Sequence, residues 1–178
     1  MSTPTPDIVA VTLDDGRRVT IRPIRRDDVV RNAAFIDELS PPSKHFLFLG
    51  GISKLSDAEL ERLCNPDHAH DMAFVALAGD PKTPGGERQV GVCRYAGTDT
   101  EAGAEISVAV ADDWQHRGLG NLLLRRLIEH ARSHGVRRLY SMDAAANEPM
   151  RRLARDVGFR EQRDPDDVRQ VIYSLQPG

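Results

Sequence analysis

Two glycines stand close together where a strand is expected to give way to a helix. The segment reads Val110-Ala111-Asp112-Asp113-Trp114-Gln115-His116-Arg117-Gly118-Leu119-Gly120, and a strongly amphipathic stretch follows it. Because glycine has no Cβ, the backbone can approach a bulky anion closely here. The first turn of a helix also leaves several N–H groups unpaired and pointing outward. The spacing therefore predicts a site for a phosphate group.

Two forces would act at such a site, and their sizes differ. The helix dipole contributes about 0.3–1 kcal/mol. Each hydrogen bond to a charged group contributes about 1.5–3 kcal/mol. Several N–H donors together outweigh the dipole, so the shape of the backbone is the expected binding element.

Other nucleotide-binding loops fit this segment poorly. A P-loop needs Lys and then Ser or Thr after its second glycine, whereas Asn121-Leu122 follows Gly120. A Rossmann dinucleotide loop needs a third small residue, and Leu123 stands there. On the glycines alone, a plain strand–helix turn without a ligand stays an alternative.

A wider pattern surrounds the loop. The loop contributes a valine, a glutamine and two glycines: Val110, Gln115, Gly118 and Gly120. Downstream of it are Arg138–Met142, Asn147 and Gly158-Phe159. Upstream of it are Arg22-Pro23-Ile24 and Asp27-Asp28. This pattern is similar to the acetyl-CoA motif and surroundings of the GNAT superfamily of N-acetyltransferases. The resemblance runs from about Val9 to Leu175.

The resemblance implies a single-domain GNAT fold of the α/β class, with a mixed central β-sheet and helices on both faces. It implies acetyl-CoA as co-substrate, with its pyrophosphate on the loop amides and its pantetheine arm on a splayed strand. A backbone N–H of that strand would face the thioester oxygen. The expected cofactor-binding residues are Val108, Val110, Gln115, His116, Arg117, Gly118, Leu119, Gly120, Asn121 and Asn147. For Asn147, a role as helix N-cap explains the residue equally well.

Other segments resemble, more narrowly, the acetyltransferase domain of bacterial protein-lysine acetyltransferases that regulate acetyl-CoA synthetase. These segments are Ile21-Arg22-Pro23-Ile24, Ser40-Pro41-Pro42-Ser43 with Phe46 and Phe48, Met72–Leu77 and Ala104-Glu105. Those relatives often carry a fused acyl-CoA synthetase-like or cyclic-nucleotide-binding region. We expect no room for either in 178 residues.

Acetyl transfer to an amine needs a neutral nucleophile. A lysine side chain has a pKa of about 10.4, so only about one in a thousand is neutral at pH 7. A general base contributes about 10²–10⁴ in rate. Glu105 is the candidate, because the resemblance implies a glutamate base at this place in the strand and because it lies opposite Ile106 on that strand. We expect its carboxylate to be partly desolvated; a solvated strand residue is the alternative.

The acid that serves the leaving thiolate is not assigned. Many GNAT enzymes use a Tyr about four residues before the Gly-Phe pair, but the stretch Leu153–Val157 holds none. A free thiol has a pKa of about 8.5, so water could suffice. Tyr140 and Tyr173 are substitutes, although packing in the sheet also accounts for both.

The predicted function is therefore an N-acetyltransferase that moves an acetyl group from acetyl-CoA to an amine acceptor, either a protein lysine or a small molecule. A non-catalytic acyl-CoA sensor with the same fold is an alternative, because a fold alone does not determine function. The identity of the acceptor and the oligomeric state stay open, with a homodimer among the arrangements.

Metal binding is not expected. The pairs His68/His70 and His130/His134 have spacings that suit a metal, but neither pair has an evident third ligand. Arg125 and Arg126 could reach the 3′-phosphate of CoA, or simply form a solvated helix face.

Composition limits the class of protein. The net charge is -3, which argues against a nucleic-acid partner or an anionic membrane surface. No apolar run is long enough to span a bilayer, and the first residues do not form a signal peptide. We expect a cytoplasmic protein in which Cys64 and Cys93 are reduced and buried.

A flexible tail is expected at residues 1–7 and one domain at residues 8–178. Hydrophobic periodicity and turn residues predict a hairpin around Asp14-Asp15-Gly16, a helix from Asp27-Asp28 that Pro41-Pro42 stops, and a short helix capped by Ser56 and Glu59. The expected later elements are, in order, strands at Met72–Ala78, Gln89–Tyr95 and Glu105–Val110, a helix at about Gly118–His134, a strand at Arg138–Met142, a helix from Asn147 to Gly158, and strands at Phe159–Arg163 and Val168–Leu175.

Overall fold

The computed structural model describes residues 8–48, 54–97 and 103–178 of the chain. The elements are, in chain order, β1 Val9–Thr12, β2 Arg18–Pro23, a 3-10 turn at Arg26–Asp28, α1 Val29–Glu38, α2 Pro41–Phe48, α3 Asp57–Leu63, β3 Met72–Gly79, β4 Glu87–Ala96, β5 Ala104–Val110, a 3-10 turn at Asp112–Trp114, α4 Leu119–Ser133, β6 Leu139–Ala144, α5 Glu148–Asp156, β7 Arg160–Arg163 and β8 Gln170–Leu175. The tail expected at residues 1–7 lies outside the described residues.

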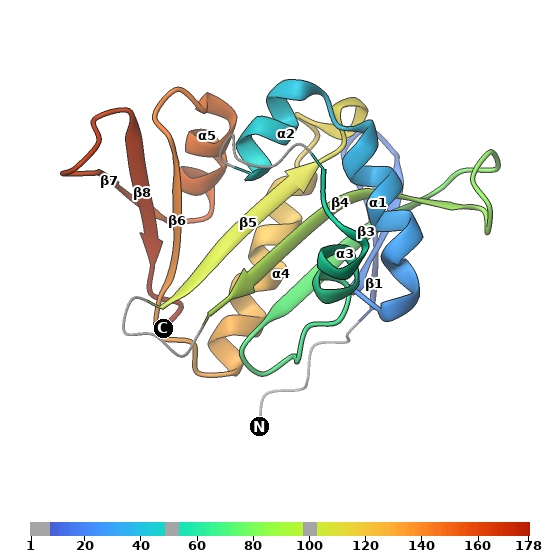
Figure 1. Cartoon of the computed structure of the whole chain (residues 1–178), viewed down its shortest axis with the longest axis horizontal. Coiled ribbons are helices and arrows are strands. Elements are labelled where there is room, and N and C mark those ends of the chain that lie inside the picture. The colour runs from blue at the N-terminus through green and yellow to red at the C-terminus, as the bar shows by residue number, and fades with distance from the viewer. Residues whose placement is uncertain (1–7, 49–53, 98–102) are drawn as a thin grey trace.

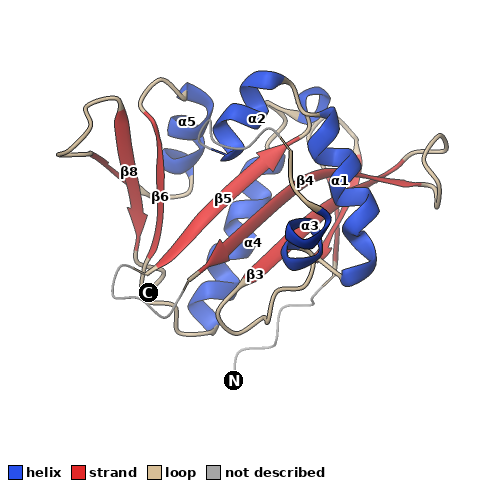
Figure 2. Cartoon of the chain, in the orientation of Figure 1, coloured by secondary structure: helices blue, strands red, loops and turns tan. Residues whose placement is uncertain are grey.

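The strands form one 8-stranded sheet in the order β1-β2-β3-β4-β5-β6-β8-β7. Neighbouring strands are antiparallel except β5 and β6, which are parallel. Helix α4 covers one face of the sheet, and α1 and α3 cover the other (Figure 2). The expected α/β class, with a mixed sheet between helices, is confirmed.

The sheet opens between its two parallel strands. Among the described residues, β5 and β6 pair only at Ala104–Leu139 and Glu105–Tyr140. Beyond these pairs β6 follows β8, with which it pairs along its whole length, and it diverges from β5 (Figure 1). A V-shaped opening results, and its closed end lies at Glu105 and Tyr140.

Helix α4 owes its position to an apolar stripe at helical spacing. The buried residues of this stripe are Leu119, Leu123, Leu124, Leu127, Ile128 and Ala131. Burial of each leucine stabilises the fold by about 1.5–3 kcal/mol. A Cβ added at Gly91 in β4 would lie 2.8 Å from the Leu123 Cδ1 atom, so the glycine lets α4 sit directly on the sheet.

A buried ion pair holds the start of α1 against β2. The two carboxylate oxygens of Asp28 accept from the Arg22 Nη1 and Nη2 atoms, each at 2.7 Å, and the Asp28 side chain is fully buried. Burial raises the pKa of Asp28, but hydrogen bonds from Arg22 and from the Arg25 N–H outweigh it, and the pKa lies below its ordinary value. This pair fixes α1 on the face of the sheet opposite α4.

Among the described α-helices, α2 is the one that the sequence pattern did not predict. Pro41-Pro42 was expected only to stop the preceding helix. That helix does end before them, at Glu38, but the prediction of their role was incomplete. The two prolines instead occupy the first positions of α2. Proline fits there because the first N–H groups of a helix have no intrahelical acceptor to lose.

The other elements follow the expected pattern within one to two residues. The capping box of α3 is present, since Ser56 Oγ accepts from the Glu59 N–H and the Glu59 carboxylate accepts from the Ser56 N–H. Both cysteines are buried free thiols, as expected, and burial raises the pKa of Cys64 to about 11. None of the described helices has the length and apolar character needed to cross a membrane.

Candidate functional site

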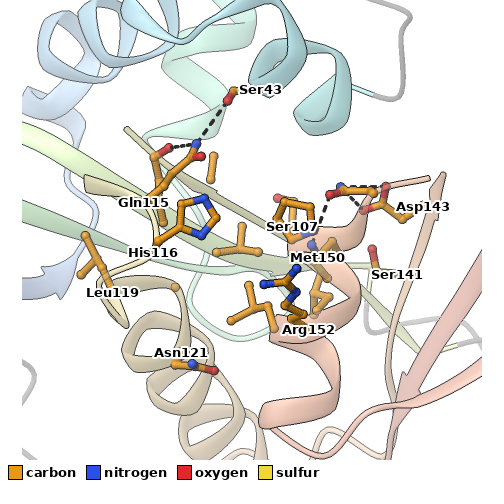
Figure 3. Close-up of a pocket in the computed structure, with 18 of the residues that line it drawn as sticks. Ser43, Ser107, Gln115, His116, Leu119, Asn121, Ser141, Asp143, Met150 and Arg152 are labelled. Carbon is orange, nitrogen blue, oxygen red and sulfur yellow. Dashed lines mark hydrogen bonds between the residues drawn. The ribbon is translucent and has the colours of Figure 1, made fainter. Parts of the chain in front are cut away.

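A cleft of about 680 Å³ occupies the opening between β5 and β6. Its walls come from β5, β6 and the facing sides of α4 and α5, and the start of α2 closes one side (Figure 3). Glu105 lies at the closed end, and the predicted phosphate loop lies at the open end. One cleft therefore contains both groups to which the sequence assigned chemistry.

The loop before α4 has the backbone shape of an anion site. His116 has φ 59° and Gly118 has φ 82°, so two nearby residues adopt the left-handed conformation. Such a turn directs successive N–H groups toward one point. In the described chain, the N–H groups from His116 to Asn121 have no hydrogen-bond acceptor, and the helical ladder starts with Leu122 N–H to Gly118 O at 3.1 Å. The predicted donors are free.

The predicted cofactor-binding residues gather in this cleft with one exception. Those that line it are Val108, Val110, Gln115, His116, Gly118, Leu119, Gly120, Asn121 and Asn147. The Arg117 side chain turns away and donates to Asp15 Oδ2 at 2.7 Å. Only the main chain of Arg117 is therefore available to a ligand.

Gly120 lets α5 approach the start of α4. A Cβ at this position would lie 3.3 and 3.4 Å from the two Cδ atoms of Leu153 in α5, and 3.8 Å from Val110 Cγ2. These first two distances are tighter than ordinary van der Waals contact. The second glycine of the motif thus sets the width of the cleft.

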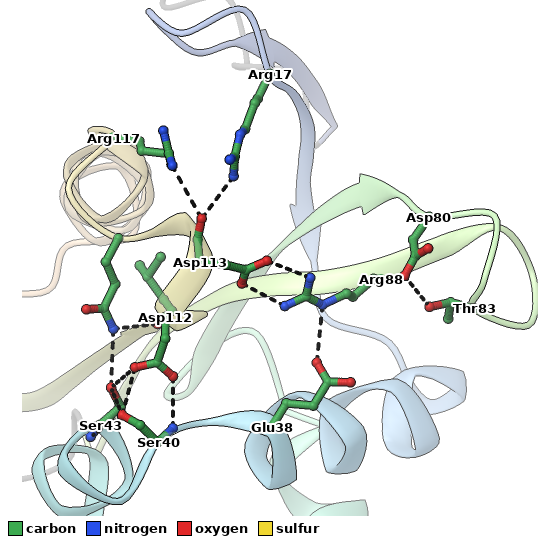
Figure 4. Close-up of polar contacts among 12 residues, drawn as sticks. Arg17, Glu38, Ser40, Ser43, Asp80, Thr83, Arg88, Asp112, Asp113 and Arg117 are labelled. Carbon is green, nitrogen blue, oxygen red and sulfur yellow. Dashed lines mark hydrogen bonds and ion pairs between the residues drawn. The ribbon is translucent and has the colours of Figure 1, made fainter.

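Asp112 connects the loop to α2 (Figure 4). Its carboxylate accepts from the Ser40 N–H at 2.8 Å, from Ser40 Oγ at 2.7 Å and from Ser43 Oγ at 2.9 Å. Partial burial raises the pKa of Asp112, but these three donors outweigh it and hold the pKa below its usual value. Gln115 Nε2 completes the connection with bonds to Ser43 Oγ at 3.2 Å and Val110 O at 3.1 Å.

Asp113 connects the same loop to the other side of the molecule. Its carboxylate accepts from Arg88 Nη1 and Nη2 at 3.0 and 2.8 Å, and this pair lowers the pKa of Asp113 (Figure 4). Its carbonyl accepts from Arg17 Nη1 at 2.9 Å. Each exposed pair stabilises little, but the two aspartates together fix the loop before any ligand arrives.

Glu105 is exposed, which differs from the expected partial desolvation. It pairs across the sheet with Ala96 of β4 and Tyr140 of β6, so it lies in a regular strand and not in a loop. Side chains alternate along a strand, so Glu105 shares a face with Ser107 and lies opposite Ile106.

Asn147 is a helix cap, as the sequence predicts. Its Oδ1 atom accepts from the Met150 N–H at 3.2 Å, and its Nδ2 atom donates to the Asp143 carboxylate at 3.2 and 3.3 Å. Both ends of the amide are thus used within the protein. The cap aligns α5 along the cleft, and any contact with the cofactor arm would be additional.

Arg152 was not predicted from the sequence, and two other arginines, for which a phosphate contact and a solvated helix face were both considered, lie outside the cleft. Arg152 of α5 lines the cleft, and its guanidinium extends toward the side where His116 lies (Figure 3). Arg126 instead lies over the Phe74 ring at 5.3 Å, and Arg125 donates to Asp156 O at 3.2 Å; neither lines the cleft. The helical spacing of Pro149, Arg152 and Asp156 could have identified the face of α5 that borders the cleft.

The tyrosines named as substitute acids do not line the cleft. Tyr173 is 1% exposed, and its hydroxyl has no hydrogen-bond partner among the described residues. Tyr140 lies 5.4 Å from the Arg138 guanidinium, which covers its ring. The packing role weighed for both tyrosines agrees better with these positions.

The described residues contain no group of three or more His, Cys, Asp or Glu side chains that could hold a metal ion. His130 and His134 stack at 3.9 Å between ring centroids on α4. The His70 Nδ1 atom lies 2.9 Å from Asp67 Oδ2, and this contact lowers the pKa of Asp67. Both pairs thus have contacts within the protein.

Comparison with known proteins agrees with this geometry. Residues 39–159 match the model of the acetyltransferase (GNAT) family. The chain is 48% identical over 164 residues to Acetyltransferase PA5475 of Pseudomonas aeruginosa. The aligned region covers 92% of this chain and 87% of that protein. The residues matched by the family model include all those that line the cleft.

Two solved structures extend the comparison. The crystal structure of the GNAT domain of S. lividans PAT superimposes with a TM-score of 0.83 and 26% identity, over 98% of this chain and 99% of that one. The cAMP-binding acyltransferase from Mycobacterium smegmatis superimposes with a TM-score of 0.64 and 24% identity, over 96% of this chain but 47% of that one. The second likeness concerns the fold alone.

Proposed function

Since this chain belongs to the acetyltransferase (GNAT) family and is an acyl-CoA-dependent acetyltransferase, we propose that it transfers the acetyl group of acetyl-CoA to an amine with Glu105 as general base. The observation that carries this proposal is the shared cleft. Free N–H donors lie at its open end, an unpaired strand edge runs along it, and a carboxylate lies at its closed end.

The loop binds the diphosphate. The N–H groups from His116 to Asn121 converge without internal acceptors, and Asp112 and Asp113 hold the loop in place. Because these donors are already oriented, binding costs little reorganisation. Arg152 adds a positive charge from the opposite wall.

The unpaired edge of β5 between Ile106 and Val110 binds the arm that connects the diphosphate to the thioester. Backbone groups on this edge have no partner on β6, so they can bond to the amides of the arm in the manner of an added strand. An N–H of this edge would also polarise the thioester carbonyl. Val108 and Val110 act here through their main chain.

Glu105 prepares the acceptor. A carboxylate at the closed end can take a proton from the amine as its nitrogen attacks the thioester carbon. The carbon–sulfur bond then breaks, and the acetylated amine and CoA leave. The exposed position of Glu105 gives the acceptor direct access from solvent.

A protein lysine is the acceptor that we favour. The sequence segments that resemble protein-lysine acetyltransferases support it, and an exposed base suits a side chain presented by a large partner. A small amine is the second candidate, because the same exposure admits it. The two are separated by measuring CoA release with lysine peptides, polyamines and amino acids as acceptors.

The test of the base is Glu105→Gln, with Glu87→Gln as the matched control. Glu87 is also an exposed glutamate on a strand of the same sheet, but it does not line the cleft. We expect Glu105→Gln to reduce kcat about 10²–10⁴-fold, with acetyl-CoA affinity unchanged, and Glu87→Gln to match the wild type. Equal turnover of both variants would remove Glu105 from the mechanism.

The non-catalytic alternative has its own result. A sensor would bind acetyl-CoA and gain about 2.7 kcal/mol of stability at 100 times the dissociation constant, but it would release no CoA with any acceptor in the panel. An enzyme shows both the stabilisation and acceptor-dependent thiol release.

A further inference from the structure

The thiolate that leaves acetyl-CoA needs a stabilising partner in the cleft. A free thiol has a pKa of about 8.5, but removal from water makes an unpaired anion much less stable. Neither tyrosine considered from the sequence lines the cleft. A donor near the sulfur would therefore have to come from another residue in the walls of the cleft.

The length of the CoA arm indicates that place. Between the diphosphate and the sulfur, the arm has about twelve bonds, which equals about four extended residues or ~14 Å. An arm that starts beside Val110 and follows β5 toward its beginning therefore ends beside Ile106. This is one residue beyond Glu105, where β5 last pairs with β6.

Ser141 lies on β6 at the same level. The parallel register pairs Ala104 with Leu139 and Glu105 with Tyr140, so the next residues, Ile106 and Ser141, face each other across the start of the opening. Both side chains are on the face opposite Glu105, because directions alternate along each strand. Glu105 and Ser141 thus approach the closed end of the cleft from opposite faces of the sheet.

The Ser141 hydroxyl is available to a ligand. Ser141 lines the cleft and is 6% exposed. Within the described residues, its Oγ atom makes no hydrogen bond, whereas the neighbouring Asp143 carboxylate bonds to Asn147. Buried hydroxyl groups almost always have a partner. Figure 3 shows Ser141 in the wall of the cleft beside Asp143.

We propose that Ser141 donates a hydrogen bond to the CoA sulfur and stabilises the leaving thiolate. This inference rests on the proposed acetyl transfer. The amine nitrogen forms a bond to the thioester carbon while Glu105 takes one amine proton. The carbon–sulfur bond then breaks with its electron pair on sulfur, and the thiolate takes up a proton through water, which balances the proton held by Glu105.

Ser141 keeps its own proton in this scheme. A serine hydroxyl is a much weaker acid than a thiol, so transfer of its proton to the thiolate would be unfavourable. A hydrogen bond to an anion is strong without such transfer. Ser141 is therefore a stabilising catalytic residue, and Glu105 is the base.

Ser141→Ala tests the proposal, and Ser174→Ala is the matched control. Ser174 is also a serine in a strand of the same sheet, β8, but it does not line the cleft. We expect Ser141→Ala to lower kcat about tenfold to a hundredfold with the affinity for acetyl-CoA nearly unchanged. Ser141→Thr retains the hydroxyl and should recover most of the rate. Ser174→Ala should behave as the wild type.

A second readout separates this role from packing. The pKa of the CoA thiol bound to each protein can be followed by the ultraviolet absorbance of the thiolate. Loss of a donor to the thiolate should raise this pKa by about one pH unit or more in Ser141→Ala, and Ser174→Ala should not change it.

The outcomes are distinct. Equal kcat and equal thiol pKa in the wild type and Ser141→Ala would overturn the role of Ser141 and leave acetyl transfer intact. A lower kcat with an unchanged thiol pKa would also overturn it, because the residue would then act through packing. Failure of the wild type to bind CoA would overturn both proposals.

Discussion

The conformation of Gly118 gives the sharpest test of how the loop works. Gly118 has φ 82°, and a Cβ at this position would contact nothing within 4 Å. An alanine therefore meets no steric obstacle, and its cost is the left-handed conformation alone, about 1–2 kcal/mol. Because the loop is exposed, we expect Gly118→Ala to relax to another conformation in the free protein.

Binding of acetyl-CoA would then have to restore the strained loop. A cost of about 1–2 kcal/mol corresponds to an increase of about five- to thirtyfold in the dissociation constant. The control is Gly135→Ala, at the other end of α4, where the glycine has φ 72° and open space around its Cβ. This variant should keep the wild-type affinity, because Gly135 lies away from the loop.

Isothermal titration calorimetry of both variants with acetyl-CoA gives the dissociation constants, and thermal unfolding gives their stabilities. We expect both variants to be folded, Gly118→Ala to bind acetyl-CoA more weakly than the wild type, and Gly135→Ala to bind it as the wild type does. If Gly118→Ala and Gly135→Ala bind acetyl-CoA equally well, the shape of this loop is not the binding element.

Three further changes test other parts of the structure. Asp28→Asn should destabilise the fold by about 3–5 kcal/mol, because Arg22 would lose its buried partner. The pKa of Asp28 is lowered in the folded state, so the stabilisation by Asp28 is complete above pH ~4 and is lost as the pH falls further. Urea unfolding at several pH values measures both effects. Arg152→Gln should raise the dissociation constant of acetyl-CoA about three- to tenfold. The control Arg155→Gln, on the exposed side of α5, should leave this constant unchanged. Equal effects of the two substitutions would mean that the phosphates bind elsewhere. Asp112→Asn should speed hydrogen exchange in residues 41–48 relative to α5, and unchanged exchange would mean that the start of α2 is held by other contacts.

Much of the fold could be predicted because its signals are local. The hairpin at Gly16, the capping box of α3 and the cap at Asn147 each depend on residues close in sequence. The loop before α4 was found for the same reason, since its two glycines stand at the start of an amphipathic helix. Local rules of backbone and capping decide such elements.

The errors concern what packs against what. Pro41-Pro42 signals equally well the end of one helix and the start of another. Ser40 and Ser43 at the start of α2 donate hydrogen bonds to Asp112, which lies far along the chain. Arg126 faces Phe74 because α4 lies on β3 and β4, which periodicity alone does not reveal.

Ser141 carried no signal in the sequence. It lies in a short strand without a motif, and its place opposite Ile106 follows from the parallel register of β5 and β6. Arg152 also belongs to no sequence motif. It lines the cleft because the Asn147 cap orients α5 along it. Residues brought together by topology need the structure to be found.

The most direct test of the account is a crystal structure of the protein with acetyl-CoA. We expect the diphosphate oxygens within hydrogen-bond distance of the N–H groups between His116 and Asn121, and the sulfur at the closed end of the cleft near Ile106 and Ser141. A diphosphate bound at any other part of the protein, with these N–H groups left without an acceptor, would contradict the central claim.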